Sequence, residues 1–231
     1  LVNIDNVLGA WPQWGIGDAD IIYEMPIHGL TLTRLVALFA DKHPENAGPV
    51  RSGRVLHAEL REEWDAGWTF AGIQRKDGTN VNDALREFGA RKKTHDLIYD
   101  LNGNKFSKHY HNVKDHKPPH HHSVHVQELV EYARGYEFPE RPFLFTDELP
   151  TAGDAATSIS LVYGGNKKNY TNSAFTYDAA TNLYARTRQD KPYVDQNNPD
   201  QALAFSNVIV QWTDLSFNGA ASAPVLREVG T

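Results

Sequence analysis

Residues 19–40, ADIIYEMPIHGLTLTRLVALFA, contain the clearest structural signal in the chain. Two short runs of apolar and β-branched residues, Ala19–Met25 and Arg34–Ala40, have the length and composition of β-strands. Between them Pro26–Leu30 predicts a turn, because Gly29 can adopt a positive φ at little cost. This stretch therefore predicts a pair of neighbouring strands, from which the rest of the fold can be worked out.

The segments that follow predict helices. Arg54–Ala66 carries apolar residues every four positions, which places them along one face of a helix. Asn80–Phe88 predicts a second helix, with Asn80 or Asn82 as its N-cap. Ser123 is expected to cap a third helix, and the polar residues 91–119 before it read as a long loop.

Beyond residue 140 the sequence pattern changes, and short strand-like runs alternate with Gly, Asn and Asp. The sequence therefore predicts an α+β protein with two α+β parts. Residues 1–140 would form an N-terminal domain of mixed sheet and helix, and residues 141–231 a mainly β C-terminal domain. The strands expected in the second domain are Ser158–Tyr163, Ala174–Asp178, Leu183–Arg188 and Asn207–Asp214.

The composition excludes several classes of function. The 231 residues are 40% hydrophobic and 11% aromatic, which is typical of a folded domain rather than a disordered chain. With 23 Lys and Arg against 29 Asp and Glu, the net charge of −6 argues against a nucleic-acid partner. The absence of Cys excludes a disulfide framework, a Cys nucleophile and an iron–sulfur cluster.

Gly48–Arg54, GPVRSGR, precedes the first predicted helix and is a candidate anion site. Backbone N–H groups at a helix N-terminus are unpaired, and Arg51 and Arg54 would add bidentate donors for a carboxylate or a phosphate. In an equally weighted alternative, Ser52 is an ordinary helix cap and the arginines pair with nearby carboxylates.

Glu24 and Arg34 lie at the end and the start of the two strands expected to pair. Opposite charges across a strand pair commonly stabilise the sheet and do nothing more. Buried beside Arg51 and Arg54, the same two side chains would instead orient the guanidinium groups for a ligand. Asp5-Asn6, near the start of the chain, reads as a turn-type dipeptide.

Seven of the 11 histidines lie between His109 and His125. On a strand His109 and His111 would point to the same side, as two metal ligands should, with a carboxylate from Asp96, Asp100 or Asp115. The favoured interpretation is a solvated polar loop, because no familiar ligand spacing occurs. No metal or other cofactor is therefore expected, and His109 and His111 are the low-ranked candidates for a metal.

Motifs that follow one another over nearly the whole chain are Ile4–Asn6, Trp11–Gln13, Ala19–Glu24, Thr33-Arg34, Gly48–Arg54, Pro119-His120 and Asn207–Gln211. Together they resemble the YerB-like family of proposed bacterial lipoproteins, known mainly as a domain of unknown function. Gly48–Arg54 is the most specific of these motifs. His121-His122 departs from the pattern, since the family typically places Asn after the Pro-His pair, so only His120 carries over.

The resemblance implies a fold of two α+β parts and an extracytoplasmic location. It also implies a lipid anchor on a Cys upstream of Leu1, the protein's means of attachment to the bacterial membrane, and a chain that continues beyond Thr231. It carries no settled activity.

Three hypotheses for function follow. The leading one is a cell-envelope binding module, in which Arg34, Arg51, Arg54 and His120, positioned by Glu24 and Ser52, hold an anionic group. Its ligand would be a peptidoglycan carboxylate, a teichoic-acid phosphate or the terminus of an envelope protein. The second is a hydrolase of a phosphodiester or glycan, with His120 as general acid or base and a metal as an optional addition. The third is a scaffold for envelope proteins that pairs a partner strand with Asn207–Asp214.

Overall fold

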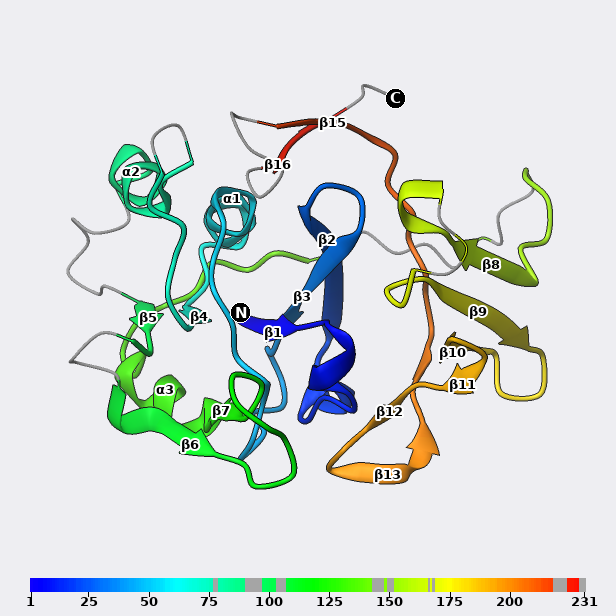
Figure 1. The fold of residues 1–231 in the computed structure, drawn as a ribbon, viewed down its shortest axis with the longest axis horizontal. Helices are drawn as coiled ribbons and strands as arrows, with labels where there is room; N and C mark the ends of the chain where they lie inside the picture. Colours follow the sequence, from blue (N-terminus) through cyan, green and yellow to red (C-terminus); the bar gives the residue numbers. More distant parts are fainter. Residues whose placement is uncertain are drawn as a thin grey trace.

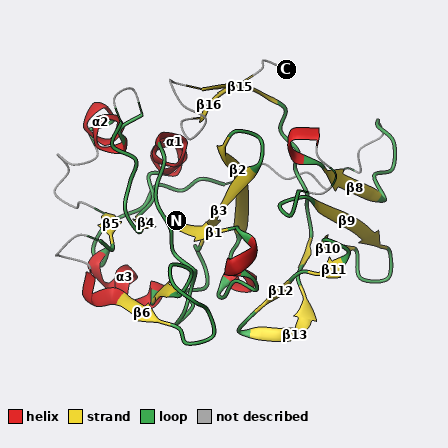
Figure 2. Cartoon of the chain, in the orientation of Figure 1, coloured by secondary structure: helices red, strands yellow, loops and turns green. Residues whose placement is uncertain are grey.

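The computed structural model describes residues 1–76, 79–89, 97–102, 107–142, 148, 152–165, 167, 169–217 and 224–228. Figure 1 shows a five-stranded sheet between two layers of helix and hairpin, with a second group of strands packed beside it. The colouring of Figure 2 shows that the described helices belong mainly to the first part and that the second part is mainly strand. The predicted α+β class is confirmed.

The first sheet has the strand order β2-β3-β1-β4-β5. The hairpin of β2 and β3 is antiparallel, and β3 pairs antiparallel with β1. β1, β4 and β5 run parallel to one another. The strands are β1 (Val2–Asp5), β2 (Ile21–His28), β3 (Leu32–Leu38), β4 (Trp68–Phe70) and β5 (Ile98–Asp100).

Both faces of this sheet are covered, because successive side chains of a strand point to opposite faces. On one face Val36 and Trp68 pack with apolar residues of α1 (Val55–Trp64) and α2 (Val81–Glu87). On the other, Ile4 and Leu35 pack with α3 (Val126–Tyr132) and with β7 of the hairpin β6–β7. The hairpin strands are β6 (Tyr110–Asn112) and β7 (His122–Val124).

The second part contains an antiparallel sheet of order β11-β10-β9-β8, with β14 also paired to β10, and two further two-stranded pairs, β12-β13 and β15-β16. Its strands are β8 (Ser158–Leu161), β9 (Ser173–Asp178), β10 (Leu183–Arg188), β11 (Lys191–Pro192), β12 (Val194–Asp195), β13 (Asn198–Ala202), β14 (Ala204–Phe205), β15 (Thr213–Phe217) and β16 (Pro224–Glu228). Short 3₁₀ helices are η1 (Leu8–Ala10), η2 (Ile16–Asp18), η4 (Ser107–His109) and η5 (Tyr163–Gly165). No helix in the described ranges is both long and apolar enough to cross a membrane.

The first hairpin is longer than the sequence predicts. β2 continues through Pro26 to His28, and Gly29, with φ of 56°, lies in the turn. Proline is tolerated there because β2 is an edge strand, where a missing N–H leaves no ladder bond unmade. The predicted turn Pro26–Leu30 was therefore placed too early.

Two expectations near the histidines are wrong. Ser123 lies inside β7 and caps no helix, and His125 is the N-cap residue of α3. Part of the expected loop 91–119 forms β5 and β6, because each finds a neighbouring strand to pair with. Residues 91–96 and 103–106 of that loop are outside the described residues.

The expected strand Asn207–Asp214 is also mostly wrong. Residues 207–212 form no strand, and β15 begins only at Thr213. Ile209 and Trp212 are 84% and 85% exposed. An extended segment becomes a strand only when a neighbour accepts its backbone hydrogen bonds, and apolar composition alone does not supply that neighbour. The hypothesis that a partner protein adds a strand to Asn207–Asp214 therefore lacks the strand edge that it requires over residues 207–212.

The two parts of the chain are joined by a buried ion-pair network. The Glu24 carboxylate lies 2.5 Å from Arg186 Nη2 and 3.4 Å from Arg188 Nη2. Arg188 also donates to Asn6 Oδ1 and to the Thr171 carbonyl. Both guanidinium groups are 3% exposed or less, so neither is satisfied by bulk water.

Replacing Glu24 with Gln should lower the free energy of unfolding by about 3–5 kcal/mol, because it leaves two buried guanidinium groups without their carboxylate. Urea unfolding measures this loss. The control is Arg86→Gln, whose ion pair with Asp83 is exposed and should contribute within about 0.5 kcal/mol. Equal losses in the two variants would contradict a stabilising role for Glu24.

Candidate functional site

Asp5 is the centre of the candidate site, and its side chain is fully buried at the end of β1. One carboxylate oxygen lies 3.0 Å from Arg51 Nε and 2.8 Å from His120 Nδ1. The other lies 3.6 Å from Arg34 Nη2 and accepts a hydrogen bond from the Asn6 backbone N–H at 2.9 Å. Sequence reasoning missed Asp5 by treating it as a turn residue, although it belongs to the Ile4–Asn6 motif.

The backbone explains why these side chains meet. β1, β4 and β5 are parallel, so Asp5, Phe70 and Asp100 end their strands at the same edge of the sheet. The Gly48–Arg54 segment crosses this edge: Arg51 N–H donates to the Asn3 carbonyl, and the Arg51 carbonyl accepts from Ala71 N–H. The carboxyl edge of parallel strands is where ligands bind in many α/β proteins.

Ser52 is not a helix cap. Its hydroxyl donates to the Ala71 carbonyl at 3.1 Å, and its own carbonyl accepts from Arg34 Nη1 at 3.2 Å. The N-cap of α1 is Arg54, whose backbone N–H donates to His57 Nδ1 at 3.2 Å. The cap expected at Ser52 is wrong because the helix begins two residues later than a Ser52 cap requires.

The arginines exceed the carboxylates in this cluster. Across the part of the chain that the structure describes, Arg54 has no Asp or Glu within ion-pair distance, and its Nη1 donates only to the Gly53 carbonyl at 2.9 Å. The Nε atoms of Arg34 and Arg54 are buried without a hydrogen-bond partner among the described residues, whereas that of Arg51 faces Asp5. Donors in excess of acceptors are what an anion-binding site requires.

The pKa values of Arg34, Arg54 and His57 are all lowered in this cluster. Burial lowers the pKa of Arg34 to about 10, and the neighbouring Arg54 and Arg51 lower it further while Asp5 opposes them. Burial and then Arg51 lower the pKa of Arg54. Burial, Arg34 and Arg54 hold the pKa of His57 well below its usual 6.5, so His57 is neutral at pH 7. Burial is the larger cause in each case and opposes charge of either sign, whereas the smaller effect of the neighbouring guanidinium groups reflects a positive potential that would attract an anion.

Other segments complete the surroundings of Asp5. The ring of His120 lies against Gly9, where a Cβ would come within 3.0 Å of its Cδ2. Tyr170, from the second part of the chain, is close enough to Asp5 for the carboxylate to raise its pKa, after burial as the larger cause. His120 and Arg51 therefore lie at one surface, with side chains 21% and 33% exposed.

Glu24 is not part of this cluster. In the β2–β3 register it pairs with Leu35, whereas Arg34 pairs with Met25, so Glu24 and Arg34 point to opposite faces of the sheet. Glu24 instead accepts hydrogen bonds from Asn6 and Thr33 and meets the arginines of β10. Its predicted role beside Arg51 and Arg54 is therefore wrong.

The histidine stretch divides between two places. His120 reaches Asp5, whereas His109 and His111 face Glu128 of α3, at 2.5 Å and 3.9 Å from its carboxylate. Of the carboxylates named as extra metal ligands, Asp100 accepts backbone N–H groups of Gly72 and Asn102, Asp115 is exposed, and Asp96 lies outside the described residues.

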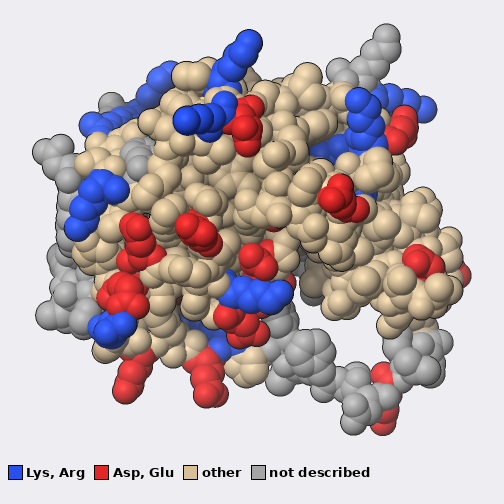
Figure 3. Space-filling view, turned by 90° about the horizontal axis from the view of Figure 1, so that it is seen from below, with Lys and Arg blue, Asp and Glu red and all other residues tan. Residues whose placement is uncertain are grey.

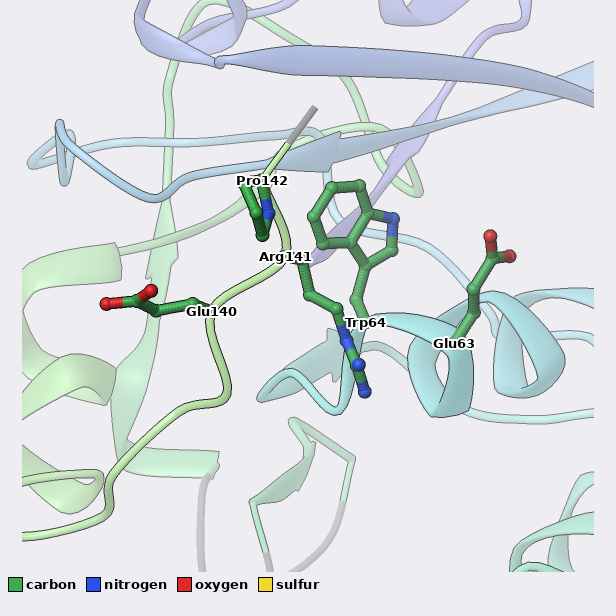
Figure 4. Close-up of a pocket in the computed structure, with 5 residues that line it drawn as sticks. All are labelled: Glu63, Trp64, Glu140, Arg141 and Pro142. Carbon is green, nitrogen blue, oxygen red and sulfur yellow. The ribbon is translucent and has the colours of Figure 1, made fainter. Parts of the chain in front are cut away.

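A hollow at the surface lies elsewhere and takes in none of the predicted site residues. Figure 4 shows Glu63 and Trp64 of α1 on one side of it and an extended segment on the other, which contributes Glu140, Arg141 and Pro142. Neither side has the excess of donors seen around Asp5. On the face shown in Figure 3, basic and acidic side chains are interspersed, as the modest net charge predicts.

Comparison with known proteins identifies the family. A model described as "Protein of unknown function (DUF3048) N-terminal domain" matches residues 1–138, and the corresponding C-terminal domain model matches residues 159–226. The first match covers more than half of the chain, so the chain belongs to this family. The resemblance stated from the motifs is confirmed.

Two comparisons give the relationship more detail. The "Putative lipoprotein YerB" of Bacillus subtilis (strain 168) is 26% identical over 219 residues, which cover 90% of this chain and 60% of that protein. The chain thus spans about 60% of the length of this curated relative. The crystal structure of Bacillus subtilis YerB matches with a TM-score of 0.77 at 23% identity, over 97% of this chain and 72% of that one, and shows the same fold.

The depressed pKa of His57 predicts a pH-dependent stability. The unfolded chain binds a proton at His57 near pH 6.5 and the folded chain does not, so stability falls as pH falls through 6.5. His57→Asn keeps an acceptor for Asn3 and Arg54, and should remove a slope of about 1.4 kcal/mol per pH unit below that point. Urea unfolding of both proteins between pH 7 and pH 5 measures the difference, and parallel curves would contradict it.

Proposed function

We propose that this member of the DUF3048 family is a binding protein for a carboxylate or phosphate group of the bacterial cell envelope, held by Arg34, Arg51 and Arg54. The observation that carries the proposal is the charge balance at the edge of the first sheet. Arg34 and Arg51 contact one described carboxylate, that of Asp5, the neighbouring Arg54 has none, and His57 beside them is neutral. A bound anion would supply the missing negative charge.

The three arginines would contribute differently to binding, because they differ in exposure and in their protein partners. Arg34 is 5% exposed and fixed by Asp5 and the Ser52 carbonyl, so it contributes potential rather than direct contact. Arg51 is a third exposed and can donate from its free edge while Nε stays on Asp5. Arg54, at the start of α1, has the fewest protein partners of the three and is the best placed to take a new one.

The setting of the ligand follows from the family. The relative is named a lipoprotein, which supports a location outside the cytoplasm, anchored to the membrane by lipid. The anions available there include peptidoglycan carboxylates, teichoic-acid phosphates and the terminus of an envelope protein. The net charge of −6 and the interspersed charges on the face shown in Figure 3 favour these over nucleic acid.

A second candidate function, hydrolysis of a phosphodiester or glycan, is favoured by the contact between His120 and Asp5. A buried carboxylate on Nδ1 fixes the tautomer of the imidazole and leaves Nε2 for proton transfer, as in many hydrolytic sites. Arg51 contacts the same carboxylate oxygen and would stabilise negative charge that develops on a phosphoryl or acyl oxygen. No metal or other cofactor is required for either proposal.

The first test is binding of untagged protein to purified cell-wall sacculi that retain their teichoic acids. Arg54→Gln should weaken pelleting about tenfold to hundredfold, because a charge-assisted hydrogen bond contributes about 1.5–3 kcal/mol. Its melting temperature should stay close to the starting value, since Arg54 has no buried ion pair to lose. Arg134→Gln is the control and should bind normally, because this arginine follows the end of α3 and its ion pair with Glu131 is exposed. Unchanged pelleting of Arg54→Gln would contradict the binding proposal.

The supernatant of the same incubation tests hydrolysis. If His120 is a general acid or base, wall fragments should be released by the wild type and fall by about a hundredfold or more in His120→Ala. The wild type and the Arg54→Gln protein together distinguish binding from hydrolysis. A protein that only binds the wall releases no fragments, whether or not Arg54 is replaced. Release that persists in His120→Ala would rule out this residue as the catalytic group.

A further inference from the structure

Three histidines and one glutamate gather on the face of α3, away from the arginine cluster. His109 ends η4, His111 lies in β6, His125 is the N-cap residue of α3, and Glu128 belongs to the first turn of that helix. Ligand atoms of His111, His125 and Glu128 all lie within 4.8 Å of one another. Residues from η4, β6 and the N-terminus of α3 thus converge on a single carboxylate.

The distances within this group are short. His125 Nδ1 lies 3.0 Å from Glu128 Oε1, and His111 Nε2 lies 3.9 Å from the same oxygen. The rings of His111 and His125 stack with centroids 3.5 Å apart and planes 12° apart. Rotation of the two rings out of their stack and a contraction of under about 1.5 Å would bring the three atoms to the spacing of a tetrahedral ion with bonds of about 2.0–2.2 Å.

One atom of the group has no partner that explains its position. His111 Nε2 is buried, makes no hydrogen bond among the described residues, and lies 3.9 Å from Glu128 Oε1. A buried imidazole nitrogen and a carboxylate oxygen that lie close together without a hydrogen bond between them are two potential ligands of one metal ion.

His109 holds the glutamate in place. Its Nδ1 lies 2.5 Å from Glu128 Oε2, the oxygen that does not face His125, and its Nε2 lies 3.1 Å from the Tyr132 hydroxyl. Its side chain is 8% exposed, whereas those of His111, His125 and Glu128 are 33%, 22% and 42% exposed. His109 is therefore a positioning residue, and the other three are reachable from solvent.

We propose that His111, His125 and Glu128 form a binding site for a divalent first-row transition metal ion, with Zn²⁺ the ion that fits best. Two imidazole nitrogens and one carboxylate oxygen are the ligand set of tetrahedral zinc sites that keep a fourth position for water or another group. Ca²⁺ and Mg²⁺ prefer sites made of oxygen ligands alone. The ion would tie β6 to α3 and thereby fix the start of the β6–β7 hairpin.

The test is a calorimetric titration of untagged, metal-stripped protein with Zn²⁺ alone. The wild type should take up one ion per chain, gain melting temperature, and give the visible d–d spectrum of tetrahedral Co²⁺ when that ion replaces zinc. Glu128→Gln and His111→Gln should each bind at least about tenfold more weakly, and His109→Gln about tenfold, since outer-shell partners are worth about 10–100-fold in affinity.

Two matched controls keep the result interpretable. Glu131→Gln removes a carboxylate from the same helix, one that pairs with Arg134 at the exposed surface, and His28→Gln removes an exposed histidine of β2. Both should bind Zn²⁺ like the wild type. No uptake by folded wild type, or equal affinity in Glu128→Gln and Glu131→Gln, would overturn the proposal, because the ion would then bind elsewhere or not at all.

Discussion

The burial of the Asp5 carboxylate at the end of β1 is the constraint on which the rest of the candidate site depends. An ionised carboxylate removed from water must find cations or hydrogen-bond donors in the protein. Here they come from β3, from the crossing segment before α1 and from residue 120, which are distant in sequence and meet only at this edge. The same need positions the arginines, and their number exceeds what one carboxylate requires.

A second buried carboxylate, Glu24, shows what a purely structural version of this arrangement looks like. Its two guanidinium groups are at most 3% exposed, and Arg188 is further satisfied by Asn6, Thr171 and the ring of Trp11. That network is closed and holds the two parts of the chain together. The Asp5 cluster is open, because Arg51 reaches solvent and Arg54 lacks a carboxylate. The two clusters contain the same residue types and differ in closure, since one is satisfied within the protein and the other is not.

Local patterns could be predicted from the sequence, and long-range pairings could not. The helix at Val55, its arginine-rich approach and the cap at Asn80 follow from a few neighbouring residues. Asp5 was missed because its burial depends on β1 lying between β3 and β4, which no local pattern shows. Glu24 was misplaced because one residue of register decides which face of a strand a side chain occupies. The strand predicted before Thr213 does not form, because a strand needs a neighbouring strand to pair with and no local pattern shows whether one is there.

The histidine-rich segment has two opposite electrostatic settings, and that opposition argues against treating it as one functional loop. His120 joins a cluster of positive potential, where a metal cation would be repelled by three guanidinium groups. His111 and His125 join Glu128, where an anion would meet a carboxylate. Between them β7 is hydrogen-bonded to the crossing segment, through Val50 N–H to the His122 carbonyl. The backbone therefore holds the two sets of histidines apart, and each set is suited to a ligand that the other would exclude.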